Sequence, residues 1–126
     1  MKYHDYHIDK YEISDRGETV TFHLVYGYAG EETDSSRITF SEVSQYNFIH
    51  TDNAIITDIY EINLPDLINE ISTEIIEWNR MYRVKMWEDD PKTYGNKLKS
   101  LGYKAWRIES AIGFYGFVIA KSASNS

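Results

Sequence analysis

The segment that most constrains the fold runs from Pro65 to about Tyr82. On a helix that turns about 100° per residue, its large apolar residues share one arc, and its acidic residues share the adjoining arc. The apolar residues are Leu67, Ile71, Ile75, Trp78 and Tyr82, and the acidic residues are Asp66, Glu70, Glu74 and Glu77. We therefore predict a helix that buries its apolar face against a core and carries an anionic stripe beside that face.

Alternating apolar and polar residues on both sides of this helix predict strands. Four strands precede the helix, at about residues 4–13, 19–28, 37–50 and 54–62, with a tight turn at residues 51–53. Asn63 is the predicted N-cap of the helix. Asp90 and Pro91 begin a second, shorter helix, which Gly102 ends. A last hairpin pairs residues 103–109 with residues 114–121 around a turn at residues 110–113.

The first two strands cannot keep one register along their whole length. Pairing Tyr11 with Val20 places Tyr6 and Ile8 on the wrong face of the sheet. One extra residue near Asp9 or Lys10 restores them to the apolar face, because a bulge shifts the side-chain alternation by one position. The sequence therefore predicts a β-bulge in the first strand.

These elements predict an α+β fold, in which an antiparallel sheet of about six strands carries the 65–82 helix on one face. The order is β-β-β-β-α-α-β-β, and we expect Leu67, Ile71, Ile75 and Trp78 to be buried with Phe22, Leu24 and Phe40. The length of 126 residues is that of one domain, predicted over residues 1–121 and followed by a mobile polar tail at 122–126. The uncharged strand 114–120 predicts either a central place in the sheet or a homodimer formed through it.

The net charge of −7 disfavours partners that are themselves anionic. Nucleic acids and acidic membrane surfaces are repelled by such a field, whereas a basic protein is attracted to it. The chain has no cysteine and shows neither a signal peptide nor an apolar run of the roughly 18 residues needed to cross a bilayer. We therefore expect a cytoplasmic protein, either a monomer or a homodimer.

No set of residues predicts catalysis, a metal or a cofactor. Asp5, His7 and Asp9 share one face of a strand at about 6.5 Å spacing, which is too wide for two of them to hold a zinc ion without a ligand from a third element. His23 and His50 have no serine or threonine in a nucleophile setting. Asp58 lies on a strand face that we expect to be covered, and Arg107 is its predicted ion-pair partner. An enzyme is therefore the least favoured class.

The acidic stripe, the excess of tyrosine and the lack of a catalytic set resemble small acidic bacterial α+β proteins of the immunity type, which neutralise a basic toxin or nuclease. The resemblance implies a non-enzymatic inhibitor of a basic partner protein. Its predicted contact residues are Asp66, Glu70, Glu74 and Glu77 on the helix and Glu31, Glu32 and Asp34 on the acidic loop.

The alternative is a small carrier or sensor that encloses an apolar ligand between the sheet and the helix. Its pocket would be lined by Tyr26, Tyr46, Asp58, Tyr60, Trp106, Arg107 and Phe117. An apolar molecule that co-purifies with the protein would favour the carrier, and a solid core without a cavity would count against it.

Overall fold

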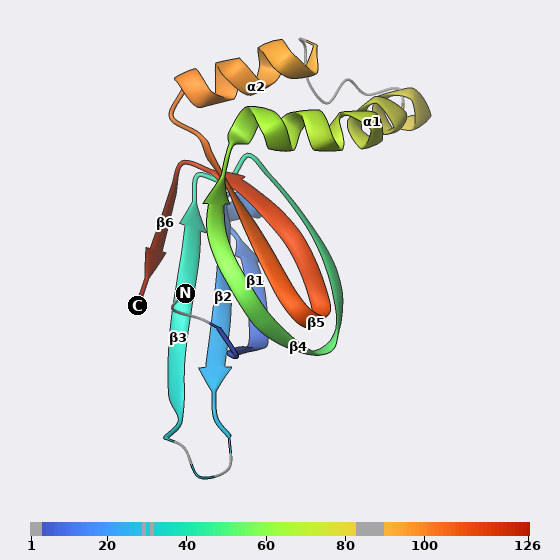
Figure 1. Ribbon diagram of the computed structural model, residues 1–126. Coiled ribbons are helices and arrows are strands. Elements are labelled where there is room, and N and C mark those ends of the chain that lie inside the picture. Colours follow the sequence, from blue (N-terminus) through green and yellow to red (C-terminus); the bar gives the residue numbers. More distant parts are fainter. Residues whose placement is uncertain (1–3, 29, 31, 83–89) are drawn as a thin grey trace.

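The computed structural model describes residues 4–28, 30, 32–82 and 90–126, apart from the side chains of residues 50–54, 57, 74, 75, 78–82, 112 and 113 (Figure 1). The strands are β1 (His7–Ser14), β2 (Thr19–Tyr26), β3 (Asp34–Ser41), β4 (Gln45–Ile62), β5 (Lys104–Ala120) and β6 (Ser122–Asn125). The helices are α1 (Leu64–Tyr82) and α2 (Pro91–Ser100), and a single 3₁₀ turn, Asp15–Gly17, joins β1 to β2.

The strands form one antiparallel sheet in the order β5-β4-β1-β2-β3-β6. The predicted bulge in β1 is confirmed, because the register shifts between Ile8 and Lys10. Tyr11 lies opposite Phe22 rather than Val20. This difference of two residues preserves the side-chain alternation, so the predicted inward face of β2, with Val20, Phe22 and Leu24 buried, is correct.

Strands β4 and β5 form a long two-stranded ribbon that folds back near its middle (Figure 1). The predicted turn at residues 51–53 lies inside β4, and the predicted hairpin turn at residues 110–113 lies inside β5. The pairing of β4 with β5 continues on both sides of the bend, and its register shifts within the part of β4 from His50 to Asp58. The predicted strand 37–50 instead breaks at Glu42, whose φ is 53°, and its second half belongs to β4.

Residues 122–126, predicted as a mobile tail, contain the short strand β6, which pairs with β3. Beyond β6, the backbones of Arg37 and Ser126 exchange two hydrogen bonds of 2.9 Å. The small, polar side chains of residues 122–126 cannot form a buried core, but their backbone can still pair with a strand. The edge of β3 that faces away from β2 is open to such pairing.

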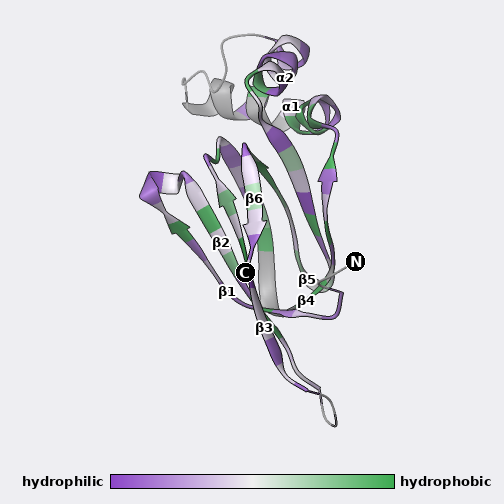
Figure 2. Cartoon of the chain, turned by 90° about the vertical axis from the view of Figure 1, so that its left-hand side faces the viewer, coloured by the Kyte–Doolittle hydropathy of each residue, from purple (hydrophilic) through white to green (hydrophobic). Residues whose placement is uncertain are grey.

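The predicted architecture, a single long helix on one face of a six-stranded sheet, is wrong. The molecule is mostly sheet, and its two helices stack on each other at one end of the strands (Figure 2). The strand order has six members because β4 and β5, which each fold back on themselves, are each counted as a single strand. The inner face that the helix was expected to cover is instead covered by the folded ribbon.

The buried side chains accordingly form two clusters rather than one. Phe22, Leu24 and Phe40 pack against the inner face of the ribbon, where Ile56, Ile108 and Val118 lie. Leu67 and Ile71 are buried as predicted, but they pack with α2 and with the outer face of β5 at Ala105, Phe117 and Ile119. The predicted burial of Ile75 and Trp78 falls on side chains outside the described residues.

Both helix starts are confirmed. The Asn63 side chain accepts a hydrogen bond from the Asp66 N–H at 3.0 Å, and Asp90 accepts one from the Thr93 N–H at 3.0 Å. Gly102 follows α2 with φ of 92°, a conformation that favours glycine after a helix.

The central position predicted for residues 114–120 is wrong, because β5 stands at one end of the strand order. A homodimer through this strand remains a prediction.

Candidate functional site

A half-buried group of charged and polar side chains lies on the outer face of the ribbon, beneath α1. Asp58 is opposite Glu109, and Tyr60 is opposite Arg107. Residues that face each other across an antiparallel pair, and those two positions away, share one face of the sheet. We call Asp58, Tyr60, Arg107, Glu109 and the nearby Glu70 of α1 the ribbon cluster.

Arg107 ties this cluster to α1. Its Nη2 donates to Oε2 of Glu70 at 2.5 Å, with the Arg107 side chain only 11% exposed and that of Glu70 53% exposed. The guanidinium carbon also lies 5.2 Å from the ring centroid of Tyr115, a cation–π arrangement. The predicted ion pair between Asp58 and Arg107 is therefore wrong, because the partner of Arg107 is a residue of the acidic stripe.

The two carboxylates on the ribbon itself are in different situations. The Tyr60 hydroxyl donates to Oε1 of Glu109 at 2.8 Å, and this hydrogen bond is the main reason that the pKa of Tyr60 is raised. Burial adds to the rise. By contrast, Oδ1 of Asp58 is buried and has no hydrogen-bond partner among the residues that the structure describes. A buried acceptor that is left unsatisfied costs about 1–3 kcal/mol, and more when it is charged.

The ribbon cluster therefore has more negative than positive charge. Its carboxylates are Asp58, Glu109 and Glu70, and Arg107 is its single cation. The residues that the structure describes contain no group of three histidine or acidic side chains suited to a metal ion. What the arrangement can do chemically is accept a cationic side chain, such as lysine or arginine, beside Asp58.

Comparison with known protein families, curated proteins and solved structures gives no match. In the described part of the chain, no helix has both the length and the apolar character needed to cross a bilayer.

The predicted acidic contact residues do not form one surface. Asp66, Glu70 and Glu77 are exposed on α1, whereas Glu32 and Asp34 lie at the β2–β3 connection, at the opposite end of the strands (Figure 1). Asp34 also accepts a hydrogen bond from the Tyr6 hydroxyl. Glu31 and the Glu74 side chain fall outside the described residues.

The residues predicted to line a ligand pocket do not enclose one cavity. Asp58, Tyr60 and Arg107 come together, but Trp106 packs on Phe40 at 5.4 Å between ring centroids, inside the first core. The rest are dispersed: Phe117 lies in the second core, Tyr26 contacts Tyr6 and Tyr28, and Tyr46 stacks on Phe48.

A cleft does lie between α1 and the ribbon. It measures about 110 Å³, and its lining residues are Asn47, Ile49, Leu67, Glu70, Ile71, Tyr115, Gly116 and Phe117. Sites for small ligands usually measure about 300–1,000 Å³, so this cleft is too small to favour a carrier. It has room for part of one side chain.

Sequence reasoning missed Glu109 and Tyr115. Both belong to the site because β5 folds back, which brings Arg107 on one arm of the strand to Tyr115 on the other. Knowing that Asp58 pairs with Glu109 would have identified Glu109, but the register between two strands far apart in the chain cannot be read from the sequence.

Proposed function

We propose that the protein is a non-enzymatic binding protein that engages a basic protein partner, most concretely as an immunity-type inhibitor. The observation that supports this function best is the buried, unpartnered oxygen of Asp58 in a cluster with surplus carboxylates. Because that oxygen is covered in this structure, a partner's cation would approach the cluster from its exposed side at Glu70 and would be attracted by the surplus negative charge.

The surroundings of the cluster suit a protein partner. Ile49 is 67% exposed and Tyr115 43% exposed, and both line the cleft beside Glu70. Tyrosine is one of the residue types that most often dominate binding energy at protein interfaces. The aliphatic stem of a lysine or arginine would pack on Ile49 and Tyr115, with its charged end directed to the carboxylates.

The net charge supports the same proposal at longer range. A field from a charge of −7 speeds the encounter with a basic protein and slows the encounter with acidic ones. We place this inhibition in the cytoplasm, which suits a chain without cysteine, and we expect neither nucleic acid nor membrane to be a partner. A monomer or a homodimer is compatible with the proposal.

The test is capture of a partner from the organism of origin by the immobilised protein. The wild type is compared with the double variant Asp58→Asn, Glu109→Gln, which keeps the shapes of both side chains and removes their charges. The matched control is Glu18→Gln, Glu42→Gln, which removes two exposed carboxylates that lie outside the cluster.

We expect a basic protein that the wild type and the control retain and the cluster variant releases, and whose toxicity on expression is blocked by the wild type and the control but not by the cluster variant. Capture that the cluster variant leaves unchanged would reject the role of Asp58 and Glu109. A captured partner that is acidic, or whose activity the wild type does not reduce, would reject the inhibitor.

A further inference from the structure

A groove at the helical end of the molecule is lined by two exposed lysines, Lys99 and Lys104. It lies where β4 passes into α1 and α2 passes into β5, its volume is about 300 Å³, and we call it the lysine groove. Its other lining residues are Glu61, Ile62, Asn63, Leu64, Gly102 and Tyr103. Neither lysine forms an ion pair with a residue that the structure describes. The groove shares no residue with the ribbon cluster, so its role is independent of the function proposed for that cluster.

The lysine groove belongs to a locally basic part of an acidic protein. Residues 91–108 contain five of the thirteen basic residues of the chain and none of the twenty acidic ones, although the net charge of the whole chain is −7. Arg107, one of the five, is engaged by Glu70. The other four are the exposed lysines Lys92, Lys97, Lys99 and Lys104. This surface would therefore attract a negatively charged group.

The opposite end of the strands is a projecting hairpin. Strands β2 and β3 remain paired as far as Tyr26 and Asp34. Strand β1 pairs with β2 no further than Val25, and among the described residues the other side of β3 is paired no further than Arg37. The end of the β2–β3 hairpin therefore extends beyond the strands that flank it (Figure 1).

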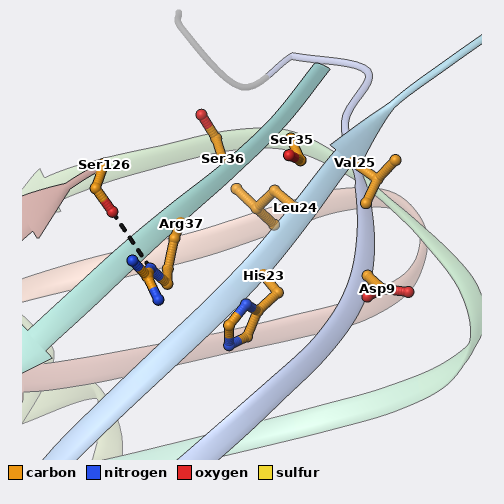
Figure 3. A pocket seen from close by; sticks show the side chains of 8 residues that line it. All are labelled: Asp9, His23, Leu24, Val25, Ser35, Ser36, Arg37 and Ser126. Carbon is orange, nitrogen blue, oxygen red and sulfur yellow. Dashed lines mark hydrogen bonds between the residues drawn. The ribbon is translucent and has the colours of Figure 1, made fainter. Parts of the chain in front are cut away.

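This hairpin end is acidic. Residues 26–36 contain no basic residue and three acidic ones, Glu31, Glu32 and Asp34, of which Glu31 lies outside the described residues. The next basic residue, Arg37, is turned toward β6, and Figure 3 shows its Nε bonded to Oγ of Ser126, at 3.3 Å. In the described part of the chain, neither Glu32 nor Asp34 forms an ion pair. The hairpin end therefore keeps its negative charge.

We propose that the lysine groove receives the acidic hairpin end of a second copy of this chain, so that copies associate head to tail. The two surfaces have complementary charges, which favours their encounter. They lie at opposite ends of the strands, so they can meet between two copies but not within one (Figure 1). After the first contact one copy still has a free groove and the other a free hairpin, so the interface is heterologous and further copies can add.

The association should depend on salt in a way that reflects these charges. Two copies with a net charge of −7 repel each other at long range, but at 0.15 M salt this repulsion is screened beyond about 8 Å. Lysines and carboxylates in direct contact lie within that distance and still attract. At 1 M salt the screening length falls to about 3 Å, so the contact itself should weaken.

The test is sedimentation equilibrium of the purified protein at 0.15 M salt, up to millimolar concentration. We expect the average mass to rise with concentration above the 14.8 kDa of one chain and to fall back at 1 M salt. The groove variant, Lys99→Gln with Lys104→Gln, and the hairpin variant, Glu32→Gln with Asp34→Asn, should each associate about fivefold more weakly or less.

An equal mixture of the two variants is the sharpest measurement. The intact hairpin of the groove variant fits the intact groove of the hairpin variant, and the two remaining surfaces are neutralised. We therefore expect the mixture to form pairs of about twice the mass of one chain and nothing larger.

Two matched controls make equal changes in net charge elsewhere on the surface. Lys92→Gln with Lys97→Gln neutralises two exposed lysines of α2 that do not line the groove, and Glu18→Gln with Glu42→Gln neutralises two exposed carboxylates away from the hairpin end. Both should associate as the wild type does, and circular dichroism shows whether each variant is folded.

Four outcomes would overturn the proposal. A wild type that stays at 14.8 kDa at every concentration does not associate. A mass that levels off at twice this value indicates a closed dimer. Loss of association in the groove variant but not in the hairpin variant indicates a different acidic occupant. Equal loss in the controls indicates a general effect of charge.

Discussion

Gly116 offers the sharpest test of the folded ribbon. A Cβ atom at this position would lie 2.5 Å from the backbone oxygen of Asn47, 2.5 Å from Cδ1 of Phe48 and 3.2 Å from Cα of Phe48. Contacts under 3.0 Å are essentially never seen for a real Cβ. Two of the three opposing atoms belong to the β4 backbone, so rotation of a side chain cannot relieve the contact, and the ribbon itself must shift.

Gly116→Ala should therefore destabilise the protein by about 3 kcal/mol, the upper end of the usual cost of forcing extra atoms into a packed core. The φ of Gly116 is not positive, so the cost is steric and not conformational. A domain of this size loses roughly 4 °C of melting temperature per kcal/mol, which predicts a fall of roughly 12 °C.

The measurement is urea unfolding of the variant and the wild type, followed by tryptophan fluorescence. Gly95→Ala is the matched control, because a Cβ there meets Cα of Pro65 at 3.4 Å and Ile68 at 3.5 Å, which are ordinary contacts. In the middle of α2, alanine should stabilise by up to about 1 kcal/mol. A Gly116→Ala variant as stable as the wild type would refute the close approach of β4 to β5.

Three further predictions concern single side chains. Asn63→Ala removes the cap that accepts the Asp66 N–H and should lower the free energy of unfolding by about 1 kcal/mol in urea; an unchanged value would contradict the capping role. Asp58→Asn removes a charge whose buried oxygen has no hydrogen-bond partner in the described part of the chain, so the free energy of unfolding should equal that of the wild type or exceed it by up to about 1 kcal/mol; a clear loss would mean that the carboxylate is satisfied. The pKa of Tyr60 in the folded protein is raised above its usual 10.0. The stability that the Tyr60 hydroxyl contributes is therefore fully present below pH 10 and is lost as the pH rises through the pKa of the folded state. Wild type should therefore lose more stability than Tyr60→Phe on alkaline titration, and parallel curves would argue against the hydrogen bond to Glu109.

Local features of the fold could be predicted from the sequence because local physics determines them. The bulge near Asp9 follows from the side-chain alternation of one strand pair, and the starts of both helices follow from Asn63, Asp90 and their neighbours. Burial of Leu67 and Ile71 follows from helical periodicity.

The partners of these elements could not be predicted, because periodicity gives the apolar face of an element but not what covers it. Leu67 was expected to meet Phe22, yet the folded ribbon covers Phe22 and leaves α1 to pack on α2 and the outer side of β5. For the same reason Asp58 and Arg107 were correctly assigned to one region while their ion pair was wrong. Glu70 reaches Arg107 only because α1 lies at the end of the ribbon.

Strand β5 serves both cores, since Val118 and Ala120 face one of them and Phe117 and Ile119 face the other. It also comes after β1–β4 and both helices in the chain. During synthesis, the apolar faces of all those earlier elements emerge from the ribosome before the strand that completes either core. Folding must then wait for contacts between distant parts of the sequence, which form slowly and leave apolar surface open to aggregation or to chaperones in the meantime.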